Sequence, residues 1–175
     1  ISVFCYPGAP LRKWIENLSS LNEDVDVLLT HGHAEQLNLY GQQSLQLPSN
    51  LQLLSIPFVS QDEYDWVLSQ CDFNIVRGED SFVRAQLAGK PFIWHIYPQE
   101  DRAHEVKLAA FLDLYLEEAN QELRLAIIAA MTWAMPSEWF GMLNQWSIYA
   151  KGWRTQLLKK QGDGGLAARL LRFTS

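Results

Sequence analysis

Short, nearly continuous apolar runs alternate with amphipathic runs over the first 97 residues of the chain. The apolar runs predict five strands, at residues 2–6, 25–29, 51–56, 73–76 and 91–97. The amphipathic runs predict helices at residues 10–21, 61–70 and 80–88, with Gly89 ending the last of them. Residues 31–48 are expected to hold a short helix and a loop. Because strands separated by helical runs of about ten residues are typical of βαβ units, we expect an α/β fold with a Rossmann-like parallel sheet and flanking helices.

After Pro98 the pattern is helical throughout. Apolar side chains recur at helical spacing around Leu108 to Tyr115, around Leu123 to Ala130, and along a tryptophan-rich stripe from Trp139 to Leu157. The stripe is typical of a buried helix face, or of a surface that another domain covers. Glycines at 162, 164 and 165 predict a break before a final helix at 166–173. We therefore expect one domain, residues 1–175, in which residues 138–175 form a C-terminal helical extension.

Composition and charge narrow the choice of partners. The chain has 175 residues, of which 48% are hydrophobic and 19% are charged. This balance argues against disorder. The net charge of −6 disfavours non-specific nucleic-acid binding. Residues 151–175 hold six basic residues and one acidic residue, a net +5, which leaves −11 for residues 1–150. An anionic ligand in the body of the domain must therefore be held by local groups. The basic tail predicts a solvated helix face, with a partner contact as the alternative.

The two cysteines and the lengths of the apolar runs indicate the cellular compartment of the protein. Cys5 and Cys71 lack the CxxC spacing of a zinc or redox site, and neither a disulfide nor a metal is expected. The apolar runs are too short to span a bilayer, and the start has no secretory signal pattern. These features predict a cytoplasmic protein without a membrane contact. The chain begins at Ile1 inside a strand-like run, so we expect a longer parent protein.

Three segments follow predicted strands, at residues 4–8, 77–81 and 97–101. In an open parallel sheet, ligands bind at the carboxyl ends of the strands. The second segment is the most informative, because Gly78 permits a tight turn and Asp80 or Ser81 is expected to cap the next helix. A helix start of this kind attracts phosphate, and Arg77 can add a planar cation. The alternative is that Asp80 and Ser81 only cap the helix while Arg77 pairs with Glu79. Because the adjacent carboxylates of Glu79 and Asp80 would repel a phosphate, we expect them to have separate roles, such as binding sugar hydroxyls.

Other polar residues are weaker candidates. His31 and His33 could hold a metal, but no third ligand stands nearby, which favours a solvated turn. His95 is expected to be a core histidine with satisfied hydrogen bonds. Asp24 and Asp26 imitate a DxD metal motif but lie at the start of a strand, the wrong end for a ligand.

One long run resembles a known family. Residues 71–101 read CDFNIVRGEDSFVRAQLAGKPFIWHIYPQED. This run is similar to the bacterial protein-arginine rhamnosyltransferases that modify translation elongation factor P, and the resemblance extends to residues 3–6 and 61–65, to His104 and to residues 107–112. Leu87 departs from the tryptophan that the family is expected to carry. We expect Leu87 to face a helix-packing surface, away from the chemistry.

The resemblance implies the C-terminal, donor-binding half of a GT-B glycosyltransferase, without its N-terminal acceptor domain. The implied donor is dTDP-β-L-rhamnose, and the implied acceptor is an arginine side chain of elongation factor P. The reaction inverts the anomeric centre and needs no metal and no cofactor. The absent half carries the aspartate expected to act as base, so the isolated chain is expected to be inactive.

The resemblance also implies roles for individual residues at the phosphate end. Asp80 and Ser81 are expected to hold the diphosphate, largely through backbone amides and the Ser81 hydroxyl. Glu79 is implied in catalysis or in positioning the sugar. Arg77 is expected to orient this acid pair or to offset phosphate charge.

The remaining implied residues contact the base, the sugar and the phosphates. Phe4 and Tyr6, two residues apart on one strand, are expected to point the same way and to form a wall for the thymine and the sugar. Phe58 is a possible stacking partner, and Gln61 can recognise the base edge. Tyr97 can donate to a phosphate, with Gln99 beside it.

A second class of function fits the same sequence. A non-catalytic module would use the Rossmann-like sheet as a nucleotide sensor, or the tryptophan-rich helices and the basic tail as a docking surface. The two hypotheses differ on Glu79, which only the enzyme requires.

Overall fold

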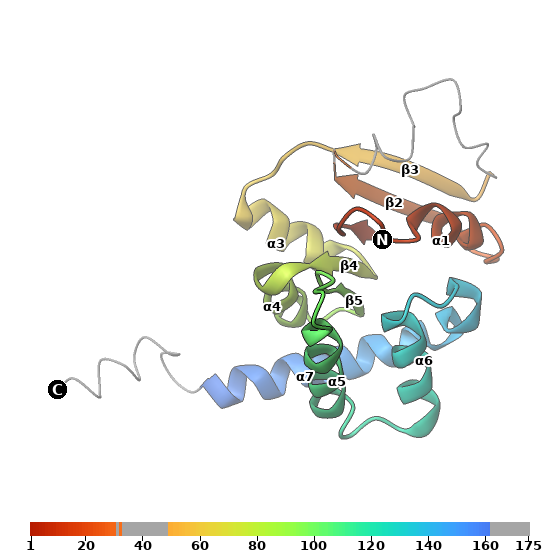
Figure 1. Cartoon of the computed structure of the whole chain (residues 1–175). Coiled ribbons are helices and arrows are strands. Elements are labelled where there is room, and N and C mark those ends of the chain that lie inside the picture. Colours follow the sequence, from red (N-terminus) through yellow and green to blue (C-terminus); the bar gives the residue numbers. More distant parts are fainter. Residues whose placement is uncertain (31, 33–48, 162–175) are drawn as a thin grey trace.

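The computed structural model describes residues 1–30, 32 and 49–161 (Figure 1). Five parallel strands form one sheet in the order β3-β2-β1-β4-β5. The strands are β1 (Ser2–Val3), β2 (Val25–Thr30), β3 (Leu51–Ile56), β4 (Asn74–Arg77) and β5 (Phe92–His95). The sheet confirms the predicted α/β class and its Rossmann-like parallel topology.

The strand order changes direction between β1 and β4. From β1 the chain moves outward to β2 and β3, and it then returns to place β4 on the other side of β1. The carboxyl edge at such a junction is where open α/β sheets bind their ligands. Buried hydrogen bonds fix this junction, because Ser2 Oγ donates to Asn74 Oδ1 at 2.5 Å and Asn74 Nδ2 donates to the Leu68 carbonyl at 3.1 Å.

Helices cover the sheet, and α5, α6 and α7 gather below it in Figure 1. α4 packs against β4, β5 and α7, and α6 packs against β5 and α7. Within the described ranges, no helix combines the length and the apolar character needed to cross a membrane. The helices are α1 (Leu11–Leu18), α3 (Gln61–Gln70), α4 (Gly78–Ala88), α5 (Ala103–Tyr115), α6 (Gln121–Met131) and α7 (Leu143–Gln161), with short 3₁₀ turns at Pro136–Glu138 and Phe140–Met142.

The tryptophan stripe belongs to the core, as the sequence predicts. Trp139 stacks on Phe73 with ring centroids 4.9 Å apart, and Trp146 and Trp153 are buried in the same cluster as the sheet. The polar ends of these rings are satisfied, since Trp146 Nε1 donates to Tyr115 Oη and Trp153 Nε1 to Gln86 Oε1, each at 3.0 Å. The C-terminal helix therefore shares the core of the sheet.

Several boundaries differ from the sequence predictions. β1 ends at Val3 although the apolar run continues to Tyr6, and α1 ends at Leu18 in a series of single turns. α4 begins at Gly78, two residues before the predicted start, whereas its end at Gly89, in the left-handed conformation with φ 68°, is confirmed. The predicted final helix at 166–173 and most of the segment 31–48, including His31 and His33, lie outside the described residues.

Candidate functional site

A pocket of about 210 Å³ opens at the carboxyl edge of the sheet, beside the junction of β1 and β4. Four segments build it: the loop after β1, the start of α4, the end of β5 with the connection that follows it, and the first turns of α5. Its lining residues are Tyr6, Gly78, Glu79, Trp94, Ile96, Tyr97, Gln99 and Lys107. The structure thus brings together residues from all three segments that the sequence singled out.

The start of α4 corrects one prediction. The residue that caps this helix is Arg77, in extended conformation and without a side-chain capping bond, rather than Asp80 or Ser81. The amides of Gly78, Glu79 and Asp80 consequently lie in the first turn, where no carbonyl of the same helix is available to them. Ser81 is buried and its hydroxyl is already engaged: it accepts from the Arg77 amide at 3.1 Å and donates to the Arg77 carbonyl. The Ser81 hydroxyl is therefore not free to bind a diphosphate in this geometry. The backbone amides at the helix start are available for a phosphate.

Gly78 makes the close approach at this helix start possible. Its φ is +63°, and a Cβ placed on it would lie 3.3 Å from the Tyr6 hydroxyl oxygen. Its carbonyl accepts a hydrogen bond of 3.0 Å from Trp94 Nε1, and the Trp94 ring stacks on Phe82 of the same helix at 3.8 Å. Trp94 thus fixes the turn from β4 into α4 against β5.

Aromatic rings and one guanidinium form the wall beside the pocket. Tyr6 and Tyr97 meet edge to face with centroids 5.2 Å apart. The Arg77 guanidinium lies over the rings of Phe4 and Tyr6, at 4.1 and 5.0 Å, and its Nη1 donates to the Cys5 carbonyl at 3.4 Å. Phe4 and Tyr6 therefore share one cation, in keeping with the expectation that they point the same way.

Two histidines hold the loops that line the pocket. His95 Nδ1 accepts a hydrogen bond of 3.1 Å from the Tyr6 amide, and His104 Nδ1 accepts one of 3.0 Å from the Gln99 amide. The Tyr6 bond explains why β1 ends early, because the amide turns toward β5 and leaves the ladder. His95 has the hydrogen bond predicted for it, but it is the half-buried last residue of β5 and not a core histidine within the strand.

Glu79 and Asp80 face different surroundings. Glu79 is exposed and lines the pocket, whereas Asp80 lines a second, larger groove of about 480 Å³. There Arg84 bridges Asp80 and Asp65 with contacts of 2.8 Å to each, and these hydrogen bonds raise the pKa of the Arg84 guanidinium. The two adjacent acids therefore have separate positions. The alternative pairing of Arg77 with Glu79 does not occur among the ion pairs of the described residues.

Six residues implied by the resemblance are not among those that line this pocket: Phe4, Phe58, Gln61, Arg77, Asp80 and Ser81. Two of them also lie apart from the aromatic wall and from the start of α4. Phe58 is 92% exposed on the connection from β3 to α3, and Gln61 is the exposed first residue of α3. α3 nevertheless reaches the aromatic wall through Tyr64, whose ring meets Phe4 edge to face at 5.8 Å. The contact of Phe58 and Gln61 with a ligand stays a prediction.

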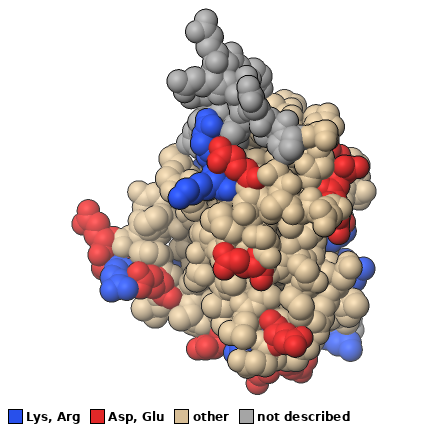
Figure 2. Space-filling model, turned by 90° about the vertical axis from the view of Figure 1, so that its right-hand side faces the viewer, with Lys and Arg blue, Asp and Glu red and all other residues tan. Residues whose placement is uncertain are grey.

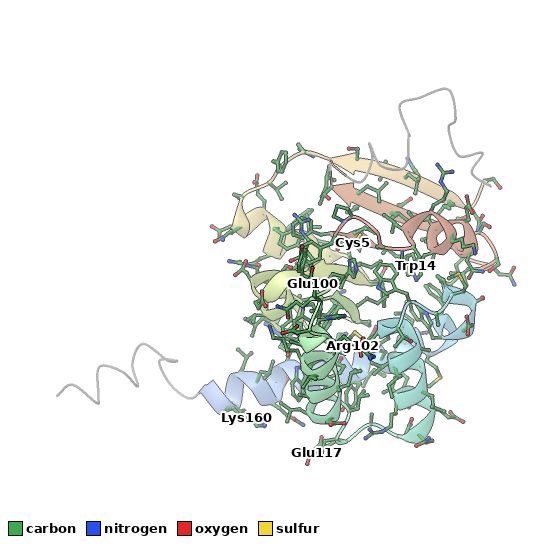
Figure 3. The ribbon with its side chains drawn as sticks, viewed as in Figure 1. Cys5, Trp14, Glu100, Arg102, Glu117 and Lys160 are labelled. Carbon is green, nitrogen blue, oxygen red and sulfur yellow. The ribbon has the colours of Figure 1, made fainter. Side chains whose placement is uncertain are left out.

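Sequence reasoning missed three residues that line the pocket: Lys107, Trp94 and Ile96. The pattern places Trp94 and Ile96 in an apolar strand and Lys107 in a helix, without a role in binding. The signal that could have found Lys107 is its place in the first turns of the helix after β5, close to Tyr97 and Gln99. Figure 3 shows Glu100 and Arg102 on the connection between that strand and that helix.

The pocket itself holds one basic and one acidic side chain, Lys107 and Glu79. On the face shown in Figure 2, most of the described surface is uncharged, a few basic side chains lie together near the top, and acidic side chains are spread over the rest. The described residues contain no group of three or more metal-binding side chains, and the expectation of metal-free chemistry stays a prediction. Aromatic rings, helix-start amides, one lysine and one carboxylate together suit a small anion attached to a ring or a sugar.

Comparisons with known proteins relate the whole chain to one family. The model of the elongation factor P (EF-P) rhamnosyltransferase family EarP matches residues 1–175. A protein-arginine rhamnosyltransferase of Pseudomonas aeruginosa is 35% identical over 187 residues, which covers 99% of this chain and 49% of the relative. One from Shewanella oneidensis is 41% identical over 135 residues, covering 71% of this chain and 33% of the relative. The chain spans about half the length of the curated relatives it matches over its full extent.

The chain also resembles a solved structure in its fold. That structure was solved to explain the structural basis for EarP-mediated arginine glycosylation of translation elongation factor EF-P. The TM-score is 0.78 at 31% sequence identity, and the match covers 99% of this chain and 59% of the other.

Proposed function

The chain belongs to the family of elongation factor P rhamnosyltransferases, and we propose that it is the donor-binding half of such an enzyme. In this proposal the complete GT-B enzyme moves L-rhamnose from dTDP-β-L-rhamnose to an arginine side chain of elongation factor P. The observation that carries the proposal is the pocket at the β1–β4 junction, which combines ring surfaces, helix-start amides and a carboxylate in a chain matched by the family over its full length.

The diphosphate is proposed to lie at the start of α4. The amides of Gly78, Glu79 and Asp80 are available there, and the helix dipole favours negative charge. These donors would act on the departing dTDP, whose charge grows as the glycosidic bond breaks, and they need no reorganisation at that moment. Ser81 contributes by holding the Arg77 backbone, which fixes where the amides point.

Tyr6, Tyr97 and Glu79 are proposed to contact the rest of the donor. The two rings offer an apolar surface with hydroxyl groups at its rim, which suits a base or a deoxy sugar. Glu79 lines the same pocket and can accept hydrogen bonds from sugar hydroxyls. The base that takes the proton of the acceptor arginine would come from the other half of the enzyme.

Calorimetric titration of the chain with dTDP tests the donor site. We expect one nucleotide to bind, and Tyr97→Ala to weaken binding by roughly tenfold, because a ring contact of about 1.4 kcal/mol is lost. Trp66→Ala is the control, since Trp66 is also an exposed aromatic residue, at 65%, but lies on α3 away from the pocket. A folded chain that does not bind dTDP would overturn the proposal.

A transfer assay separates the enzyme from a non-catalytic module. The chain alone, mixed with dTDP-rhamnose and elongation factor P, is expected to transfer no sugar. In a protein that holds both halves, Glu79→Ala is expected to lower transfer roughly tenfold or more. Unchanged transfer by this variant would favour a binding module that only senses or docks.

A further inference from the structure

Two cations lie near the pocket, and one of them is already engaged. The Arg77 guanidinium is held over Phe4 and Tyr6 and donates to the Cys5 carbonyl. Arg77 is also absent from the described residues that line the pocket. Its charge therefore supports the aromatic wall, and a ligand in the pocket would not meet its donors directly.

Lys107 is the one basic residue among the described residues that line this pocket. It is exposed on α5, and its ammonium has no hydrogen-bond or ion-pair partner in the described part of the chain. A lysine without a partner keeps all three donors for a ligand. Lys107 is thus free to approach an anion without breaking an existing contact.

The backbone that carries Lys107 is fixed relative to the pocket. The connection from β5 to α5 is closed by the Arg102 amide, which donates to the Gln99 carbonyl at 3.0 Å, and by the bond from the Gln99 amide to His104. Arg102 also pairs with Glu105 through contacts of 2.9 and 2.6 Å. Lys107 follows within the second turn of this helix. Its flexible side chain therefore extends from a backbone that these contacts hold in place.

The other charges at the pocket indicate a role for the Lys107 ammonium. Glu79 lines the same pocket, and the chain carries a net charge of −6. A nucleoside diphosphate placed beside Glu79 meets a carboxylate, which the neutral amides of α4 only partly offset. One ammonium in the same pocket offsets Glu79 and makes the site receptive to a diphosphate.

We propose that Lys107 recognises the diphosphate of the nucleotide-sugar, while Arg77 positions the aromatic wall. The proposal rests on the proposed donor-binding function and assigns to Lys107 the choice of a nucleoside diphosphate over a monophosphate. The helix start binds the phosphate next to the nucleoside, and Lys107 meets the charge that the second phosphate adds.

Calorimetry with dTDP and dTMP tests this division of roles in four forms of the chain: wild type, Lys107→Ala, Lys107→Arg and Lys13→Ala. Lys13 is an exposed lysine on α1 and serves as the control for a lost surface charge. We expect Lys107→Ala to weaken dTDP binding about tenfold or more and dTMP binding much less. Lys107→Arg should restore most of the dTDP affinity, and Lys13→Ala should change neither nucleotide by more than about twofold.

The outcomes distinguish this proposal from the proposed function. If the wild-type chain does not bind dTDP, the donor-binding function itself fails. If the wild type binds dTDP and Lys107→Ala binds it equally well, only the role of Lys107 is overturned. Equal weakening of dTDP and dTMP, with a lowered thermal unfolding midpoint, would show a structural role and would also overturn it. A weaker dependence of dTDP affinity on salt in Lys107→Ala would support it.

Discussion

The guanidinium of Arg77 lies over the ring of Phe4, with its central carbon 4.1 Å from the ring centroid. This contact joins the loop after β1 to the start of α4, because the Arg77 backbone is also held by the Ser81 hydroxyl. The two sides of the β1–β4 junction are thereby fixed to each other before any ligand arrives.

Arg77→Lys is expected to lower the free energy of unfolding by about 1 kcal/mol, because lysine keeps the charge but lacks the planar face that stacks on Phe4 and Tyr6. Thermal or denaturant unfolding measures the effect. Arg12→Lys is the matched control, since Arg12 makes an exposed ion pair with Glu16 at 3.8 Å. This control should change stability by less than about 0.5 kcal/mol. Equal stability of the two variants would contradict a structural role for the Arg77 stack.

Gly78→Ala and Gly152→Ala are expected to act in opposite directions. Alanine at 78 must adopt a φ of +63° and meet the Tyr6 hydroxyl. It should therefore destabilise the chain by about 1 kcal/mol or more and weaken dTDP binding. Gly152 lies inside α7 with open space around its missing Cβ. Alanine there should stabilise the chain by about 0.5–1 kcal/mol. Denaturant unfolding of both variants checks the signs, and a stabilising Gly78→Ala would mean that the tight turn is not required.

Two tyrosines with buried hydroxyl groups should also respond oppositely to loss of the hydroxyl. The Tyr64 hydroxyl is buried and has no hydrogen-bond partner among the described residues. Tyr64→Phe should therefore raise the free energy of unfolding by about 1 kcal/mol. The Tyr115 hydroxyl accepts from Trp146 Nε1, and its removal leaves a buried donor unpaired. Tyr115→Phe should cost about 1–3 kcal/mol. If denaturant unfolding showed Tyr64→Phe to be the more damaging change, the assignment of the unpartnered hydroxyl would be wrong.

The buried thiols should resist alkylation in the folded chain. Burial raises the pKa of Cys5 to about 12, although the nearby Arg77 charge opposes this, and burial also raises the pKa of Cys71. Because the thiolate is the reactive form and a raised pKa depletes it, iodoacetamide at a pH of about 8 should label both cysteines slowly in the native chain. The same reagent should label them quickly in guanidinium chloride. Native labelling at the unfolded rate would show that Cys5 is accessible.

Elements with strong local signals were predictable from the sequence. α3 runs from Gln61 to Gln70 as predicted, because Ser60 and Glu63 form a capping box at its start. β4 and β5 were visible as apolar runs because α4 packs against both and α6 packs against β5, which buries most of their residues. β3 lies at the edge of the sheet and is only partly buried. Gly89 ends α4 as predicted, since the left-handed conformation favours glycine there.

The boundaries and the site depended on contacts between distant parts of the chain. β1 ends early because His95 takes the Tyr6 amide, 89 residues away in sequence. α4 begins two residues early because Ser81 bonds back to Arg77 instead of capping a later start. Lys107 reaches the pocket only because the connection after β5 folds back beside Tyr97, which no local pattern encodes.

A crystal structure of the chain with dTDP-β-L-rhamnose would locate each part of the donor. We expect the diphosphate between the amides at the start of α4 and the Lys107 ammonium, with the rhamnose beside Glu79 and Tyr97. A donor bound elsewhere, such as in the groove that Arg84 and Arg154 line, would contradict this expectation.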